Sequence, residues 1–246
     1  MNTIENKTLE EIIGANFTRA TVFENFSIDY TLWMHETLAK VCSYYVVELP
    51  ILVFALESVR NEPLKLDFQA FDIPALIAYL VNTHHDYAKS KLPHLKNNIK
   101  KLAEKEGSLP GFYEAFEKFS IDLKKHILLE EKVIFPHILA MFNQYQNFDY
   151  ESSKKLLDDQ SADLLSASHT KDDDEMAELK ILSASFSFKD TDPIDYKIIM
   201  TDLSHLEKDI HSHANIEDNI LFQKARNIEL LLKERIKIQE RLAKKM

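Results

Sequence analysis

The chain has 246 residues and a formal net charge of −10, and 45% of its residues are hydrophobic. A surface this acidic argues against nucleic acid as a main partner, because phosphate binding requires a basic surface. The only cysteine, Cys42, excludes an internal disulfide and a thiolate metal cage, which fits a reducing compartment.

Residues 1–62 have the pattern of a small helical domain. Glycine and proline are scarce throughout the chain while Leu, Lys, Glu, Ile and Ala are plentiful, which favours an all-α protein. Short helices are predicted around residues 9–13, 20–26, 37–42 and 49–59. The polar stretch from Asn61-Glu62-Pro63 to Asp67 predicts a linker before the second domain.

Residues 70–246 predict four long helices. The first starts at Pro74 and runs to about Glu106, the second carries the apolar series from Phe116 to Ile134, the third covers about 151–183, and the fourth runs from about Ile199 into the basic tail. We therefore predict an antiparallel four-helix bundle preceded by the small helical domain, and such bundles place metal sites between facing helices. Pro93 and Pro136 lie inside helical patterns and should kink or loosen them.

Two ten-residue stretches of the bundle repeat one pattern. The stretch that starts at His126 reads HILLEEKVIF, and the one that starts at His213 reads HANIEDNILF. Residues four apart share one face of a helix. Each copy therefore points one imidazole and one carboxylate in the same direction, His126 with Glu130 and His213 with Glu217.

A further histidine precedes each copy on the apolar stripe of the preceding helix. His85 continues the helical series of Val81 and Leu92, whereas His84 lies about a third of a turn away and is the alternative to His85. His169 has the same place before the second copy. The separations are similar, 41 residues (85 to 126) and 44 residues (169 to 213), as expected for a duplicated helix pair.

Imidazoles and carboxylates that converge inside a bundle are costly to bury unless a cation pairs with them. A single His-x-x-x-Glu is commonplace on solvated helices, but the duplication favours a metal site. We predict a binuclear metal centre in which two carboxylates bridge ions about 3.5–4 Å apart. The predicted ligands are His85, His126, Glu130, His169, His213 and Glu217. Nitrogen and oxygen donors without thiolate suit iron, with manganese or zinc possible. Glu131, one position round the helix, should contribute little.

These motifs resemble those of the hemerythrin-like proteins, and more closely the di-iron family that repairs iron–sulfur clusters (repair of iron centres). The matching stretches are 83–87 followed by Leu92-Pro93, 126–136 and 209–222. Around His169 the pattern departs from the family, because Ser168 and Asp173 replace an acidic residue and a glycine. The resemblance implies two iron ions bridged by an oxo or hydroxo group.

Residues 1–62 also resemble the small leading domain of that family. The family has a Cys-Cys pair where this chain has Thr31-Leu32, and only the later Cys42 remains. The segment is therefore predicted to dock partners rather than to perform thiol chemistry, with a possible homodimer through residues 1–62. Six apolar residues form either its contact surface or its own small core: Phe17, Val22, Phe23, Phe26, Leu32 and Trp33.

The resemblance implies repair of iron–sulfur clusters damaged by nitrosative or oxidative stress, with damaged iron–sulfur proteins or the diatomic ligands O2 and NO as partners. The alternative is a di-iron sensor or binding module for oxygen or nitric oxide that signals through the N-terminal domain. Whether repair is an enzymatic turnover stays open at this point. No apolar run approaches the roughly 20 residues of a membrane span, and no signal peptide is evident, so we expect a cytoplasmic protein without a membrane partner.

Overall fold

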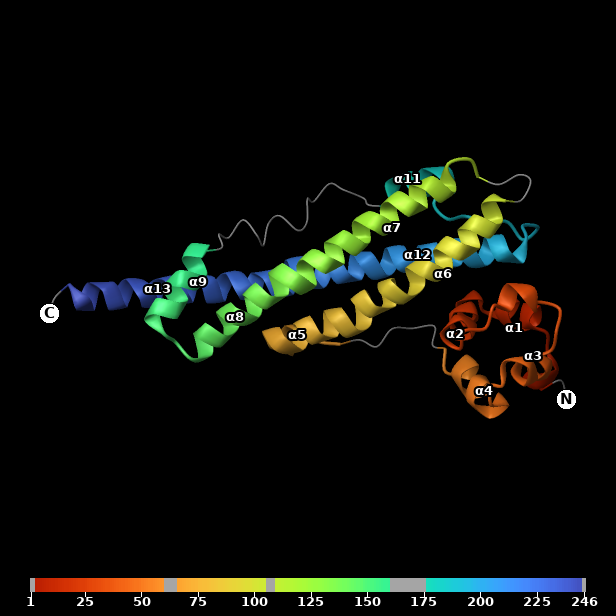
Figure 1. The fold of residues 1–246 in the computed structure, drawn as a ribbon, viewed down its shortest axis with the longest axis horizontal. Helices are drawn as coiled ribbons and strands as arrows, with labels where there is room; N and C mark the ends of the chain where they lie inside the picture. Colours follow the sequence, from red (N-terminus) through yellow and green to blue (C-terminus); the bar gives the residue numbers. More distant parts are fainter. Residues whose placement is uncertain (1–2, 60–65, 105–108, 160–175, 245–246) are drawn as a thin grey trace. The chain divides into compact units, whose positions relative to one another are not determined.

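The part of the chain that the structure describes folds almost entirely as helices (Figure 1). The computed structural model describes residues 3–59, 66–104, 109–159 and 176–244. No strand occurs in these ranges, where the only extended pairing is an isolated bridge between Thr8 and Thr37. The predicted all-α class is therefore confirmed. No helix within the described ranges is both long and apolar enough to cross a bilayer.

Two compact units divide the chain. Unit 1 comprises residues 1–65, 91–116 and 177–207, and unit 2 comprises residues 66–90, 117–176 and 208–246. Three long helices contribute residues to both units: α6 (Asp86–Ala103), α7 (Phe112–Leu129) and α12 (Ile194–Ile216). The N-terminal segment is therefore grouped with parts of the long helices, and each unit has its own apolar core.

The N-terminal segment of unit 1 contains the four short helices predicted from periodicity. They are α1 (Leu9–Ala15), α2 (Ala20–Asn25), α3 (Leu38–Tyr45) and α4 (Leu49–Glu57). The 3-10 turn η1 (Ile4–Asn6) precedes α1, η2 (Phe17–Arg19) lies between α1 and α2, and η3 (Tyr30–Leu32) lies between α2 and α3. Thr8 starts α1 with a capping box, because its hydroxyl accepts from the Glu11 N–H at 3.2 Å while Glu11 accepts from the Thr8 N–H at 2.8 Å. Val46 ends α3 in the left-handed conformation (φ 58°).

The short helices bury an apolar core of their own. Its buried members include Leu9, Ile13, Phe23 and Leu52, together with Ile198 of α12. Of the six apolar residues in question, Val22 and Phe23 are buried there, and Phe17, Phe26 and Trp33 are partly buried against it. Leu32 is instead 74% exposed. Five of the six therefore serve this core, and Leu32 is the member that presents a free apolar surface.

A buried ion network ties α2 to α6 and α12 within unit 1. The Lys91 ammonium donates to Thr21 Oγ1 at 2.9 Å and to Glu24 Oε2 at 2.8 Å, and it lies 2.7 Å from Asp202 Oδ2. The side chains of Lys91 and Asp202 are each 2% exposed. Burial outweighs the attraction of Lys91 and raises the pKa of Asp202 to about 6. The network fixes the position of α2 against α6 and α12, because each charge is costly to bury without its partners.

Three helical rods contribute to unit 2, and each is interrupted by one π-helical segment, called a wide turn below. They are α5 (Ile73–Tyr79) with η5 (Leu80–His85) and α6; α7 with η6 (Glu130–Ile134) and α8 (Phe135–Gln146); and α12 with η7 (Glu217–Leu221) and α13 (Phe222–Ala243). Asp72 accepts from the Ala75 N–H, so α5 begins beside Pro74 as predicted. In Figure 1, α5 runs opposite to α8 and α13.

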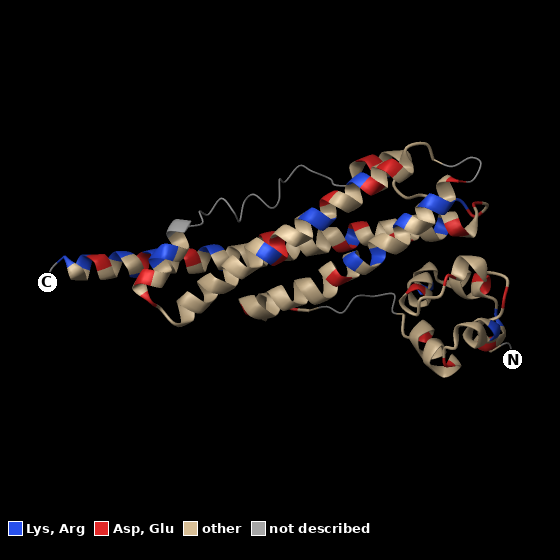
Figure 2. Ribbon diagram, in the orientation of Figure 1, with Lys and Arg blue, Asp and Glu red and all other residues tan. Residues whose placement is uncertain are grey.

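The core of unit 2 lies where α5, α8 and α13 pack together, and it includes Leu76, Phe135, Ile138 and Leu232. Helix α5 carries no Lys, Arg, Asp or Glu and is tan throughout in Figure 2, whereas charges of both signs alternate along α13. A short 3-10 turn, η4 (Phe68–Ala70), precedes α5. The helical-bundle class predicted from the four periodic segments is confirmed.

Two separate helices lie within the range of the predicted third helix. Helix α9 (Tyr150–Asp159) packs on α8 and α13 in unit 2, and α11 (Ala177–Leu182) lies in unit 1. Residues 160–175 between them lie outside the described residues, and so does the predicted ligand His169.

Candidate metal centre

All three wide turns of unit 2 are π-helical and coincide with predicted ligands. In each, a backbone N–H donates to the carbonyl five residues earlier: Asp86 to Val81, Phe135 to Glu130, and Phe222 to Glu217. Single π turns inside α-helices are rare and occur frequently at functional sites. His85 ends the first turn, and Glu130 and Glu217 begin the other two.

Proline is not what these turns have in common. Pro136 follows the turn η6, so the loosening predicted there occurs, but Gln223 occupies the same place after η7. Helix α6 meanwhile continues through Pro93 without a turn of this kind. The shared feature of η6 and η7 is the repeated sequence pattern itself, which begins each turn at a glutamate.

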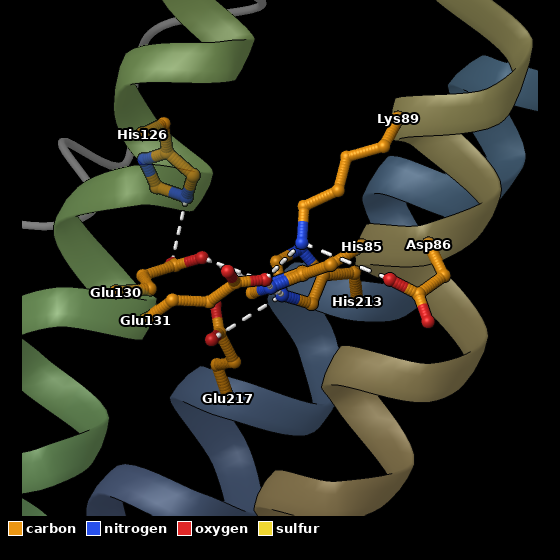
Figure 3. Close-up of polar contacts among 8 residues, drawn as sticks. All are labelled: His85, Asp86, Lys89, His126, Glu130, Glu131, His213 and Glu217. Carbon is orange, nitrogen blue, oxygen red and sulfur yellow. Dashed lines mark hydrogen bonds and ion pairs between the residues drawn. The ribbon is translucent and has the colours of Figure 1, made fainter.

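Three of the predicted histidines face the glutamate of the first copy (Figure 3). His126 Nε2 lies 2.8 Å from Glu130 Oε1, and His85 Nε2 lies 3.1 Å from Glu130 Oε2. His213 Nε2 lies 3.8 Å from the same Oε2 and 3.3 Å from Glu217 Oε1. Each of these imidazoles therefore presents Nε2 to the carboxylates.

Four residues form the centre of this arrangement. His85, Glu130, His213 and Glu217 each offer a donor atom, and these atoms all lie within 4.8 Å of one another. Both carboxylates are 0% exposed, and His85 and His213 are also buried. His126, more exposed at 15%, lies beside Glu130 at the edge of this group. The structure thus brings together five of the six predicted ligands from three helical rods.

The two buried carboxylates have pKa values that are shifted in opposite directions. Burial and the negative charge of Glu130 raise the pKa of Glu217 well above its ordinary value. For Glu130, burial acts in the same direction, but hydrogen bonds from His126 and His85 outweigh it and lower the pKa. Burial lowers the pKa of His213 to about 3, which keeps the imidazole neutral. Imidazoles around paired carboxylates match the donor set of a transition-metal site.

His84 occupies a different place from His85, although the two are adjacent in the sequence. Its Nδ1 lies 2.9 Å from Asp209 Oδ1, and its ring stacks on His213 at 5.6 Å between centroids. His84 is therefore a neighbour of the cluster, while His85 is a member of it. Asp209 was not among the predicted site residues, although it lies four residues before His213 on the same helical face.

Glu131 has a closer relation to the cluster than its helical position predicts. Its Oε1 lies 2.9 Å from His85 Nδ1 and 2.5 Å from Lys89 Nζ. This carboxylate contacts a member of the cluster directly, a contact that the expectation of little metal loss in Glu131→Ala did not include. The visible signals were the acidic pair Glu130-Glu131 and the spacing of four residues between His85 and Lys89.

Together, the helical bundle and the buried His/Glu cluster define a metal-binding bundle protein. The family profile of the hemerythrin HHE cation-binding domain matches residues 76–225, which is more than half of the chain. The chain belongs to this family, and the resemblance predicted from the two repeated motifs is confirmed.

Curated relatives cover nearly the whole chain at low identity. The iron-sulfur cluster repair protein YtfE of Cronobacter sakazakii is 21% identical over 213 residues, which is 84% of this chain and 90% of that protein. The YtfE proteins of Salmonella paratyphi B and Salmonella newport are each 22% identical over 214 residues, with the same coverage. The similarity therefore includes segments outside the cation-binding domain.

Proposed function

We propose that the chain holds two iron ions, with His85, His126, Glu130, His213 and Glu217 among the ligands and His169 as the sixth. The observation that carries this proposal is the buried group of two carboxylates and two imidazoles whose donor atoms lie within 4.8 Å. The two buried glutamates can both be ionised only when a cation balances their charge, and nitrogen and oxygen donors without thiolate suit iron. Manganese and zinc are the alternative metals for the same nitrogen and oxygen donors.

The carboxylates and the apolar side chains around them would have different roles in such a site. Glu130 faces all three imidazoles and Glu217 faces His213, which supports the proposal that both carboxylates would hold the ions. Buried apolar side chains such as Phe135, whose ring lies parallel to that of His85, exclude water from the cluster. Bound iron would supply one-electron redox chemistry and open positions for a small diatomic ligand.

The relatives suggest a biological role for such a site. Because the YtfE proteins are named for iron–sulfur cluster repair and match 84% of this chain, we propose that the chain serves in the same repair in the cytoplasm. Its partners would be iron–sulfur proteins damaged by nitrosative or oxidative stress, or the ligands O2 and NO.

Residues 1–62 are proposed to contact a client or a second copy of the chain. Three of their apolar side chains are strongly exposed: Leu32 at 74%, Val46 at 90% and Phe54 at 73%. Exposed apolar side chains gain free energy when a partner covers them. Sedimentation of wild type and of a Phe54→Ser variant tests a homodimer, which the variant should weaken; two monomeric samples would leave the client as the partner.

Repair can be tested directly with a damaged enzyme. Protein expressed in iron-rich medium should contain two iron ions per chain and should restore the activity of aconitase that nitric oxide has damaged. Glu130→Gln, which removes the shared carboxylate, should lose iron and restore nothing. Wild-type protein that carries two iron ions yet restores no activity would contradict the repair function but not the metal site.

The sensor remains the second candidate because one feature of unit 1 favours it. Thr31-Leu32 stands where the repair family has its cysteine pair, and these residues line a pocket of about 510 Å³ together with Met34, Asn98 and Ile198. A sensor would bind nitric oxide at the iron and change the exposure of residues 1–62 without restoring aconitase. Hydrogen exchange of residues 1–62 with and without nitric oxide separates the two functions.

A further inference from the structure

His85 is held between two consecutive carboxylates. Its Nε2 lies 3.1 Å from Glu130 Oε2 inside the cluster, while Nδ1, on the opposite side of the ring, lies 2.9 Å from Glu131 Oε1. The ring also stacks on Phe135 at 5.6 Å, with an interplanar angle of 10°. Figure 3 shows Glu131 projecting from the helix of Glu130 toward His85. The ring is therefore fixed on both edges and on one face.

Glu131 is itself anchored from the helix that carries His85. Lys89 Nζ donates to Glu131 Oε1 at 2.5 Å, the same oxygen that faces His85 Nδ1, and Lys89 also lies 3.7 Å from Asp86. The side chain of Glu131 is 21% exposed, compared with 43% for Lys89. Lys89 therefore holds the carboxylate against the imidazole from the solvent side, and this link joins η6 to the start of α6.

We propose that Glu131, held by Lys89, is a positioning residue for the metal centre. It accepts the Nδ1–H of His85, which fixes the tautomer that leaves the Nε2 lone pair for the metal. A carboxylate behind a ligating histidine also makes the imidazole a better donor. This inference rests on the proposed metal site, and it adds a carboxylate and a lysine that act through His85 rather than on the metal.

The affinity for Fe2+ tests this role. Competition with a chelator under anaerobic conditions should show about 10–100-fold weaker Fe2+ binding for Glu131→Leu than for wild type. Lys89→Met should lie between the two, because the carboxylate remains but loses its anchor. Glu240→Gln is the matched control: this half-exposed acid lies on α13, 23 residues after Glu217, contacts Lys154 at 3.3 Å, and its loss should leave the affinity unchanged.

A second readout does not depend on metal. In metal-free protein labelled with 15N at histidine, Nδ1 of His85 should carry a proton that is hydrogen-bonded to Glu131, and Glu131→Leu should lose the signal of that hydrogen bond. Glu131→Gln has nearly the shape of the wild-type side chain, so it serves as a second variant should Glu131→Leu fail to fold. If Glu131→Leu and Glu131→Gln both retain the affinity and the wild-type signal of that hydrogen bond, the inference is overturned. Wild-type protein that binds no Fe2+ would overturn the proposed metal site, whereas the proton on His85 Nδ1 would still test the contact between His85 and Glu131.

Discussion

The buried network around Lys91 offers a strong quantitative test of the fold. Lys91 lies 2.8 Å from Glu24 Oε2 and 2.7 Å from Asp202 Oδ2, and all three side chains are almost fully buried. Lys91→Met keeps an apolar stem of similar length but removes the charge that both carboxylates share. Removal of one partner from a buried ion pair costs about 3–5 kcal/mol, because the remaining charge is left uncompensated.

The same variant has a built-in pH dependence. The pKa of Asp202 is already raised to about 6 by burial, and the loss of Lys91 raises it further. The Lys91→Met protein therefore binds a proton that the wild type lacks near neutral pH. We expect the full cost of about 3–5 kcal/mol at pH 7.5 and a clearly smaller cost at pH 5.5, where that proton is readily available.

Urea unfolding of metal-free protein at both pH values measures these costs. Lys101→Met is the matched control on the same helix, because Lys101 pairs with Asp29 at 2.9 Å with both side chains 38% exposed, and such pairs contribute about 0–1 kcal/mol. The triple variant Lys91→Met, Glu24→Gln, Asp202→Asn should recover most of the lost stability. A Lys91→Met protein that is no less stable than Lys101→Met would refute the reasoning.

Three further outcomes are expected. Metal-free Glu217→Gln should have a melting temperature equal to or higher than that of the wild type, because burial beside Glu130 already favours a neutral group at this position. The variant should nevertheless bind fewer than two metal ions, and binding of two ions would contradict the ligand role of Glu217. The pKa of Asp202 is about 6 in the folded protein, compared with an ordinary value of 3.8. The free energy of unfolding should therefore fall by up to about 1.4 kcal/mol per pH unit as the pH rises from 3.8 to 6. Asp202→Asn should flatten this fall in urea unfolding, and an unchanged slope would count against the raised pKa. Cys42 is buried and burial raises its pKa, so iodoacetamide should modify it far more slowly in native than in unfolded protein; equal rates would disagree with the structure.

The repeated motif predicted most of the cluster because it depends only on helical spacing. His126 with Glu130 and His213 with Glu217 are four residues apart, and the choice of His85 over His84 followed from the apolar stripe that continues from Val81. The structure places these side chains together as that spacing requires. Local periodicity is thus sufficient where a site is built from one face of each helix.

Other features depend on information that spacing does not contain. The three π turns shift the helical register by one residue at His85, Glu130 and Glu217, and a strict 3.6-residue period therefore points Glu131 away from His85. The Lys91 network joins residues 67 positions (24 to 91) and 111 positions (91 to 202) apart, so it becomes visible only once the chain is folded. Its members read as ordinary charged residues on helices.

The central claim is that the buried His/Glu cluster binds a pair of iron ions. Anaerobic titration of metal-free protein with Fe2+, followed by Mössbauer spectra of the 57Fe-loaded sample, tests this claim most directly. The account predicts saturation at two iron ions per chain with the spectrum of a coupled pair, and loss of that spectrum in Glu130→Gln. Saturation at one ion or none in the wild type, or a spectrum that Glu130→Gln leaves unchanged, would contradict the account.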